Sequence, residues 1–202
     1  MRRTWLTALV LMVACGGAVQ DGVSNTSSTS ELSQLRAEIG AGPDSPVIAL
    51  GDDMIVVPAS VFGTSTDVVG RFLFLAIRER TGQVRGRYRV SEALEGSTFH
   101  YSGPLTCAGV YDFNGLTGNR AKVGGRVDAT DDASVGVGSF IWWQAIDNER
   151  LHRPDQSTLA GFGDEAANQA FCQSSTPPRF GPFDVVQGNI VVGPGGDDDE
   201  DE

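Results

Sequence analysis

The sequence predicts a mainly β fold, a single antiparallel barrel or sandwich with one or two short helices. Two observations lead to this prediction. At least six segments with strand character follow one another between Val68 and Val192, and turn residues, glycine above all, separate them. The 202-residue chain is also long enough to bury a substantial core in one domain of ordinary size.

The first two of these segments predict a β-hairpin. Residues 71–77 are apolar at nearly every position, which is typical of a strand covered on both faces. Residues 83–90 alternate apolar or small side chains with arginines, and residues 79–82 between them have turn chemistry. We interpret the arginine stripe as a solvated face balanced by nearby acids; it consists of Arg85, Arg87 and Arg89.

The remaining strands are predicted with less uniform patterns. Residues 98–101 and 105–113 form two strands separated by Ser102-Gly103-Pro104, and the paired Gly124-Gly125 indicates a bulge or a tight bend. Residues 114–119 are turn material, while 135–146 and 184–192 supply further strands. The two short apolar runs at 47–50 and 54–57 fit either an edge strand or an ordered loop.

Two short helices complete the expected fold. Ser30 can cap a helix in which Leu32, Leu35 and Ile39 follow helical spacing, and Gly40 ends it. Asp164 can cap a second helix of one or two turns that extends to Cys172.

The amino-terminus has the form of a secretory signal. Arg2 and Arg3 precede an apolar run from Leu6 to Val13 that is too short to span a membrane, and the small residue Ala14 follows. The segment Leu11-Met12-Val13-Ala14-Cys15 resembles the lipobox of bacterial lipoproteins. That resemblance implies cleavage before Cys15, which then carries the acyl chains. An ordinary signal cut after Ala14 or Ala18, giving a secreted protein, is the alternative.

These features divide the chain into four parts. Residues 1–14 form the lipoprotein signal peptide, and 15–30, rich in Gly, Ser, Thr and Asn, form a flexible tether. Residues 31–192 form the single β-rich domain, with its core at about 68–192. Residues 193–202 form a disordered acidic tail.

The charge of the chain excludes one class of partner. The net charge is −11, and six of the acids lie in the terminal run 197–202. A surface this acidic repels phosphates, so we expect no nucleic-acid binding. Without a basic amphipathic helix, attachment to a membrane depends on acyl chains at Cys15.

The three cysteines fall into one lipidation candidate and one possible disulfide pair. If Cys15 is lipidated, Cys107 and Cys172 remain as a disulfide pair in an oxidising compartment. Two separate buried thiols are the alternative. The sequence contains no CxxC pattern and no Cys/His spacing of a zinc site.

Candidate catalytic and metal-binding residues are few. His152, Asp155 and Ser157 are the residue types of a hydrolase triad, but no nucleophile elbow accompanies them, and a polar loop explains the same residues. His100 is interpreted as a strand histidine with one wet face. The Asp112 and Asp131 loops can bind calcium or act as ordinary turns. We therefore assign no catalytic residue, no metal and no cofactor.

Trp142 and Trp143 are the best candidates for a binding surface. As neighbours in a strand they face opposite sides, so one fills the core. The other is either covered by a helix or loop, or exposed as a platform for a glycan or a protein partner.

The body of the chain has a wider resemblance. The segments Gly103-Pro104-Leu105-Thr106-Cys107, 118–127, Phe171-Cys172 and 188–192 resemble a group of secreted bacterial β-rich domains without an assigned activity. This resemblance supports secretion and a β fold, but it transfers no site.

Together these features lead to one expected function. We expect an envelope-anchored lipoprotein, in the outer membrane if the cell has one, with a non-catalytic binding or interaction role. Its partner would be an envelope protein, a glycan or a small apolar ligand. The alternatives are a small-molecule carrier with a cavity inside the barrel and a hydrolase that uses the His152 loop.

Overall fold

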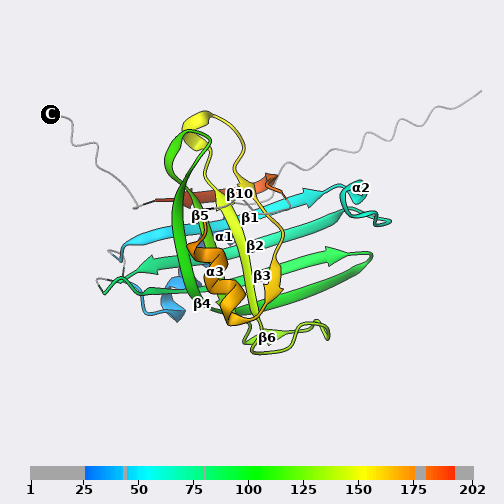
Figure 1. Cartoon of the computed structure of the whole chain (residues 1–202), viewed down its shortest axis with the longest axis horizontal. Helices are drawn as coiled ribbons and strands as arrows, with labels where there is room; N and C mark the ends of the chain where they lie inside the picture. The colour runs from blue at the N-terminus through cyan, green and yellow to red at the C-terminus, as the bar shows by residue number, and fades with distance from the viewer. Residues whose placement is uncertain (1–25, 43–44, 80, 176–180, 194–202) are drawn as a thin grey trace, which may run out of the picture.

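Eight antiparallel strands close into a barrel (Figure 1), so the barrel alternative of the prediction is confirmed. The computed structural model describes residues 26–42, 45–79, 81–175 and 181–193. The signal peptide, Cys15, the tether up to residue 25 and the acidic tail from residue 194 lie outside the described residues.

The barrel strands are β1 (Val47–Val57), β2 (Val68–Arg78), β3 (Val84–Leu94), β4 (Ser97–Phe113), β5 (Leu116–Arg126), β7 (Phe140–Ile146), β8 (Gln156–Ser157) and β10 (Phe183–Val192). Two short strands, β6 (Ala129–Thr130) and β9 (Gly161–Gly163), pair with β4 and β7. The helices are α1 (Thr26–Glu38), α2 (Ala59–Phe62), α3 (Glu165–Gln173) and the 3₁₀ helix η1 (Glu149–Leu151).

Each barrel strand pairs with its neighbours in the order β1-β2-β3-β4-β5-β7-β8-β10, and β10 returns to β1. The predicted β2–β3 hairpin is therefore confirmed. The arginine stripe is balanced as expected: Arg87 and Arg89 pair with Glu38 of α1, and Arg85 pairs with Glu79.

The predicted break at Ser102-Gly103-Pro104 is wrong, because β4 runs through it as one 17-residue strand. Its first half pairs with β3 up to Pro104, and its second half pairs with β5 from Leu105 onward. Pro104 lies where β4 changes partners, so its missing N–H interrupts neither ladder. The bulge predicted at Gly124-Gly125 lies instead on the partner strand β4, where the register shifts between Leu105 and Cys107, opposite these two glycines.

Three further expectations need correction. Residues 47–57 form neither an edge strand nor a loop but the continuous strand β1, which pairs with β2 on one side and β10 on the other. The first helix begins at Thr26 rather than after Ser30, so residues 26–30 belong to α1 and not to the tether. The turn after β4 comprises only Asn114 and Gly115, and β5 begins at Leu116.

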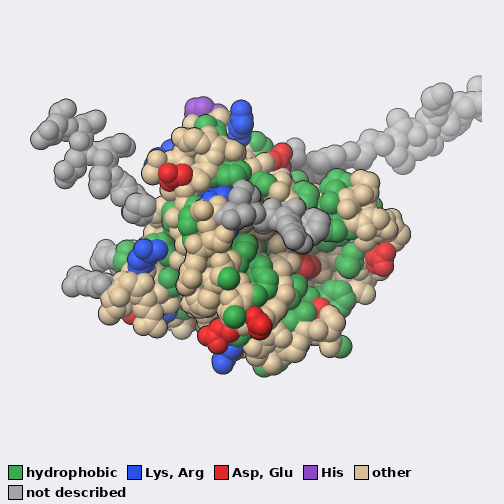
Figure 2. All heavy atoms as spheres, viewed as in Figure 1, with side chains coloured by type: hydrophobic (Ala, Val, Ile, Leu, Met, Phe, Trp, Pro, Cys, Tyr) green, Lys and Arg blue, Asp and Glu red, His purple; other side chains and the backbone are tan. Residues whose placement is uncertain are grey.

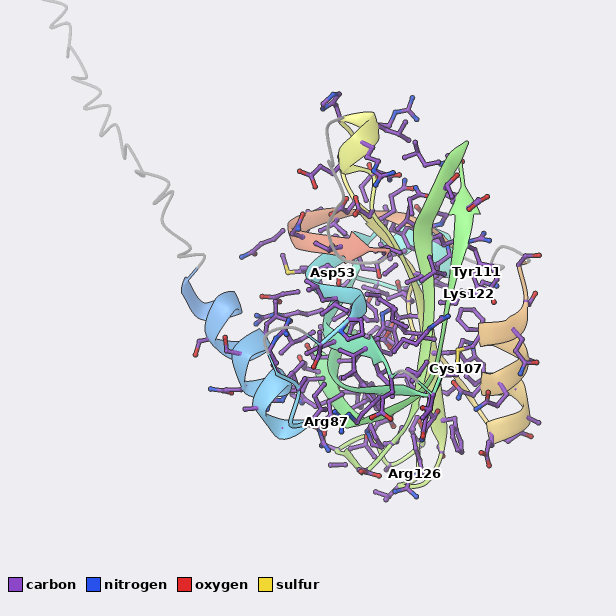
Figure 3. The ribbon with its side chains drawn as sticks, turned by 90° about the vertical axis from the view of Figure 1, so that its left-hand side faces the viewer. Asp53, Arg87, Cys107, Tyr111, Lys122 and Arg126 are labelled. Carbon is purple, nitrogen blue, oxygen red and sulfur yellow. A yellow bond between two sulfur atoms is a disulfide. The ribbon has the colours of Figure 1, made fainter. Side chains whose placement is uncertain are left out.

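The helices α1 and α3 cover opposite sides of the barrel (Figure 3). Leu35 of α1 is fully buried against Leu73, Leu75 and Ile77, the outward-facing residues of β2. This contact explains why β2 is apolar on both faces. The helix α3 is capped as predicted, because Asp164 accepts a hydrogen bond from the Ala167 amide at 2.8 Å.

The interior of the barrel is filled by aromatic rings. Trp143 is fully buried, and its ring centroid lies 5.5 to 5.7 Å from those of Phe72, Phe74 and Tyr88. Trp143 is therefore the tryptophan of the pair that packs into the core.

Candidate functional site: an apolar pocket at the barrel mouth

A pocket of about 830 Å³ opens at the end of the barrel where β2 begins and β3 ends. It lies between α2 and α3, on a face where hydrophobic side chains gather (Figure 2). Its residues come from five strands, the helices α2 and α3, and three loops. The most prominent are Phe62, Glu92, Leu94, Phe99, Tyr101, Asp132, Trp142, Leu159, Phe162 and Phe171.

The alternation of side chains along β3 places the carboxyl of Glu92 in this pocket. Tyr88 and Val90 on β3 are buried and face the interior, so Glu92 lies on the same face at the end of the strand. Phe99 pairs directly with Glu92 across the β3–β4 ladder. The loop 158–160 and the start of β9 line the mouth, and the Ala160 amide donates a hydrogen bond of 2.9 Å to Oε1 of Glu92.

Burial dominates the electrostatics of Glu92. It raises the pKa of this carboxyl to about 7; the Ala160 hydrogen bond opposes the rise and the charge of Asp132 adds to it. Asp132 behaves in the opposite way. Hydrogen bonds from Ser134 and from the Tyr101 hydroxyl (2.8 Å to Oδ2) lower its pKa, so it remains ionised.

Trp142 lines the pocket from the outer face of β7. Its ring packs against Phe171 of α3 with centroids 6.1 Å apart. Gly161 of β9 leaves room for the indole, because a Cβ there would lie 2.5 Å from Nε1. The two tryptophans thus face opposite sides as expected, and Trp142 is the partly covered one that contributes to a surface.

The rim of the pocket is apolar and exposed. Phe62 of α2 is 40% exposed and Leu94 of β3 is 37% exposed, although both line the pocket. Exposed large hydrophobic side chains at the edge of a cavity favour the approach of an apolar molecule.

The three residues of the hypothetical triad do not come together. Ser157 is buried and its hydroxyl donates to the Gln144 carbonyl at 3.2 Å. Asp155 accepts from the amides of Asn148 and Ile190. His152 is exposed at the end of η1. Each side chain therefore has a structural environment of its own.

Of the other candidate residues, His100 and Asp131 contact each other, and Asp112 has a separate partner. Nδ1 of His100 is 2.7 Å from Oδ2 of Asp131 on the barrel surface, and Asp112 accepts from the Gly118 amide. Within the described ranges, no group of three or more His, Cys, Asp or Glu side chains is placed to hold a metal ion.

A disulfide joins Cys107 of β4 to Cys172 of α3, which confirms the predicted pair. Figure 3 shows Tyr111, Lys122 and Cys107 on the side of the barrel that faces α3. Tyr111 and Lys122 donate to the carbonyls of Cys172 and Ser174, the second at 2.6 Å. Burial lowers the pKa of Lys122 to about 8. We interpret this cluster as the attachment of α3 rather than as a site.

The sequence reasoning overlooked Glu92 and Asp53. Extending the alternation of residues 84–90 by one step would have placed Glu92 on the interior face. Asp53 is fully buried in β1, and no pattern in its surroundings indicated this.

The chain matches no protein-family model, no curated protein and no solved structure. In the part of the chain that the structure describes, no helix has the length and apolar character needed to cross a membrane.

Proposed function

We propose that this protein binds a small apolar molecule in the pocket at the barrel mouth and does not catalyse a reaction on it. We further propose that it is a lipid-anchored component of the bacterial envelope. The size of the pocket is the main observation that supports binding. Its volume of about 830 Å³ falls in the range of roughly 300–1,000 Å³ that is typical of small-molecule sites.

The position of the pocket distinguishes this proposal from a carrier with a cavity deep inside the barrel. Trp143 and the rings around it occupy the interior, so the mouth is the part of the barrel that offers space. The lining is mostly aromatic and aliphatic, and the exposed rings of the rim lead into it.

Binding can be tested with N-phenyl-1-naphthylamine, a neutral fluorophore whose emission rises in apolar surroundings. Phe62→Asp and Leu94→Asp place a charge at the rim, and we expect each to weaken binding at least tenfold. Val186→Asp is the matched control, since Val186 is 57% exposed on β10 and does not line the pocket. Absence of binding, or equal affinity in all variants, would contradict the proposal.

The anchor requires a separate test. The lipobox-like segment ending at Cys15 supports it. We expect the intact mass of protein purified from its native membrane to correspond to a chain that begins at Cys15 and carries acyl chains. An unmodified terminus after Ala14 or Ala18 would show a secreted protein and leave the pocket proposal standing.

A further inference from the structure

The charge of the pocket lining points to a class of ligand. We propose that the pocket selects a cationic amphiphile, an apolar body with a protonated amine that faces Glu92 and Asp132. This inference rests on the proposed function and deepens it, because it names the polar group that the apolar ligand carries.

The first argument is the sign of the charged groups. Glu92 and Asp132 are the two ionisable carboxyls of the lining, and among the described residues that line the pocket none is Lys, Arg or His. An anionic amphiphile such as a fatty acid would bring a third negative charge into the same partly desolvated space. A protonated amine would instead offset the charge that is already there.

The second argument is hydrogen-bonding capacity. A carboxylate can accept about four hydrogen bonds. Glu92 accepts one from the Ala160 amide through Oε1. An ammonium group has three donors and no acceptor, so it complements a pocket whose charged groups only accept.

The third argument is the aromatic lining. Tyr101, which donates to Asp132, packs against Phe162 with ring centroids 4.8 Å apart. Phe99, the cross-strand neighbour of Glu92, and Trp142 add two further rings to the lining. The faces of such rings attract cations, most strongly when the cation is removed from water. Carboxylates and ring faces together distinguish an ammonium group from a neutral hydroxyl.

The experiment compares three ligands with the same ten-carbon chain, decylamine, decan-1-ol and decanoate. Each displaces N-phenyl-1-naphthylamine at pH 8, below the critical micelle concentrations of decylamine and decanoate and below the solubility limit of decanol. The amine is protonated at this pH, because primary alkyl amines have pKa values of about 10. We expect decylamine to bind at least tenfold more tightly than decanol, and decanoate to bind most weakly.

The variant Glu92→Gln keeps an acceptor for the Ala160 amide and removes the charge. We expect it to lose most of the preference for decylamine over decanol. Glu149→Gln, on η1 and outside the pocket, is the matched control and should keep the preference.

The outcomes separate the two proposals. If the fluorophore and decanol bind but the amine has no advantage, or Glu92→Gln keeps the full advantage, the inference is wrong and the proposed function stands. If neither the fluorophore nor any of the three ligands binds, the proposed function is wrong and the inference falls with it.

Discussion

Asn168 of α3 lies directly over Gly124 of β5. A Cβ built on Gly124 would be 1.9 Å from Oδ1 of Asn168, which is fully buried and donates through Nδ2 to the Thr106 hydroxyl at 3.0 Å. The helix therefore approaches the barrel as closely as it does because this position has no side chain.

Gly124→Ala should destabilise the fold by about 1–3 kcal/mol, since the added methyl group overpacks the contact with α3. Gly136→Ala is the control, because the nearest atom to a Cβ there is 3.9 Å away. Urea unfolding of both variants measures the difference. Equal stabilities would show that α3 can shift without loss.

Loss of the Cys107–Cys172 disulfide should lower the free energy of unfolding by roughly 4 kcal/mol in the chain-entropy model, because the bond joins positions 65 residues apart. The double variant Cys107→Ala, Cys172→Ala and the reduced wild type should agree. Denaturation with and without reductant tests this. Since α3 supplies Phe171 to the pocket, binding of N-phenyl-1-naphthylamine should weaken in parallel.

Asp53 predicts a pH dependence of stability. Burial raises the pKa of its carboxyl well above 3.8; Ser157 opposes the rise only in part, because its hydroxyl donates to Gln144. A raised pKa of a buried acid means that the folded state binds more protons than the unfolded state. Stability therefore falls as the pH rises above about 4, by up to about 1.4 kcal/mol per pH unit.

Asp53→Asn keeps the shape of the side chain and removes this titration. We expect it to be more stable than the wild type at pH 8, with the difference shrinking toward pH 4. Unfolding free energies measured across this range test the point, and parallel curves for the two proteins would contradict it.

Glu92 predicts a pH dependence of binding. Its pKa of about 7 means that the carboxyl gains its charge as the pH rises from 6 to 8, whereas Asp132, with a lowered pKa, stays ionised throughout. The affinity for decylamine should therefore rise several-fold over this interval in the wild type. The titration should be flat in Glu92→Gln, and an equal rise in both would place the titrating group elsewhere.

Leu35→Ala should cost about 2–5 kcal/mol, because the side chain is fully buried between α1 and β2. Gln34→Ala, exposed on the same helix, should be close to neutral. Thermal unfolding of the two variants shows whether α1 belongs to the folded domain. Identical transitions would show that the packing of α1 does not stabilise the folded domain.

Local patterns predicted much of the fold, and pairing at long range decided the rest. The alternation in residues 83–90 and the cap at Asp164 depend on near neighbours, and both predictions are confirmed. The course of β1 through Asp52 and Asp53 depends on β2 and β10, which lie far along the chain. Sequence patterns that treat acids as surface residues could not place Asp53 inside a barrel.

The candidate site was predicted only in part for the same reason. The opposite orientation of Trp142 and Trp143 follows from strand geometry alone. That the outward ring would meet Phe171 and Gly161 of β9 depends on where α3 and β9 attach, and no local pattern encodes this. Strand geometry could also have predicted that Glu92 faces the interior, because it continues the alternation of β3.

The place of β10 in the barrel has a consequence for the synthesis of the protein. Its residues Val185–Val192 pair with β1, the first strand, while Phe183 and Asp184 pair with β8. The sheet therefore cannot close until residue 192 has emerged from the ribosome. Until then β1 keeps an unpaired edge on which a nascent chain is open to chaperones and to aggregation.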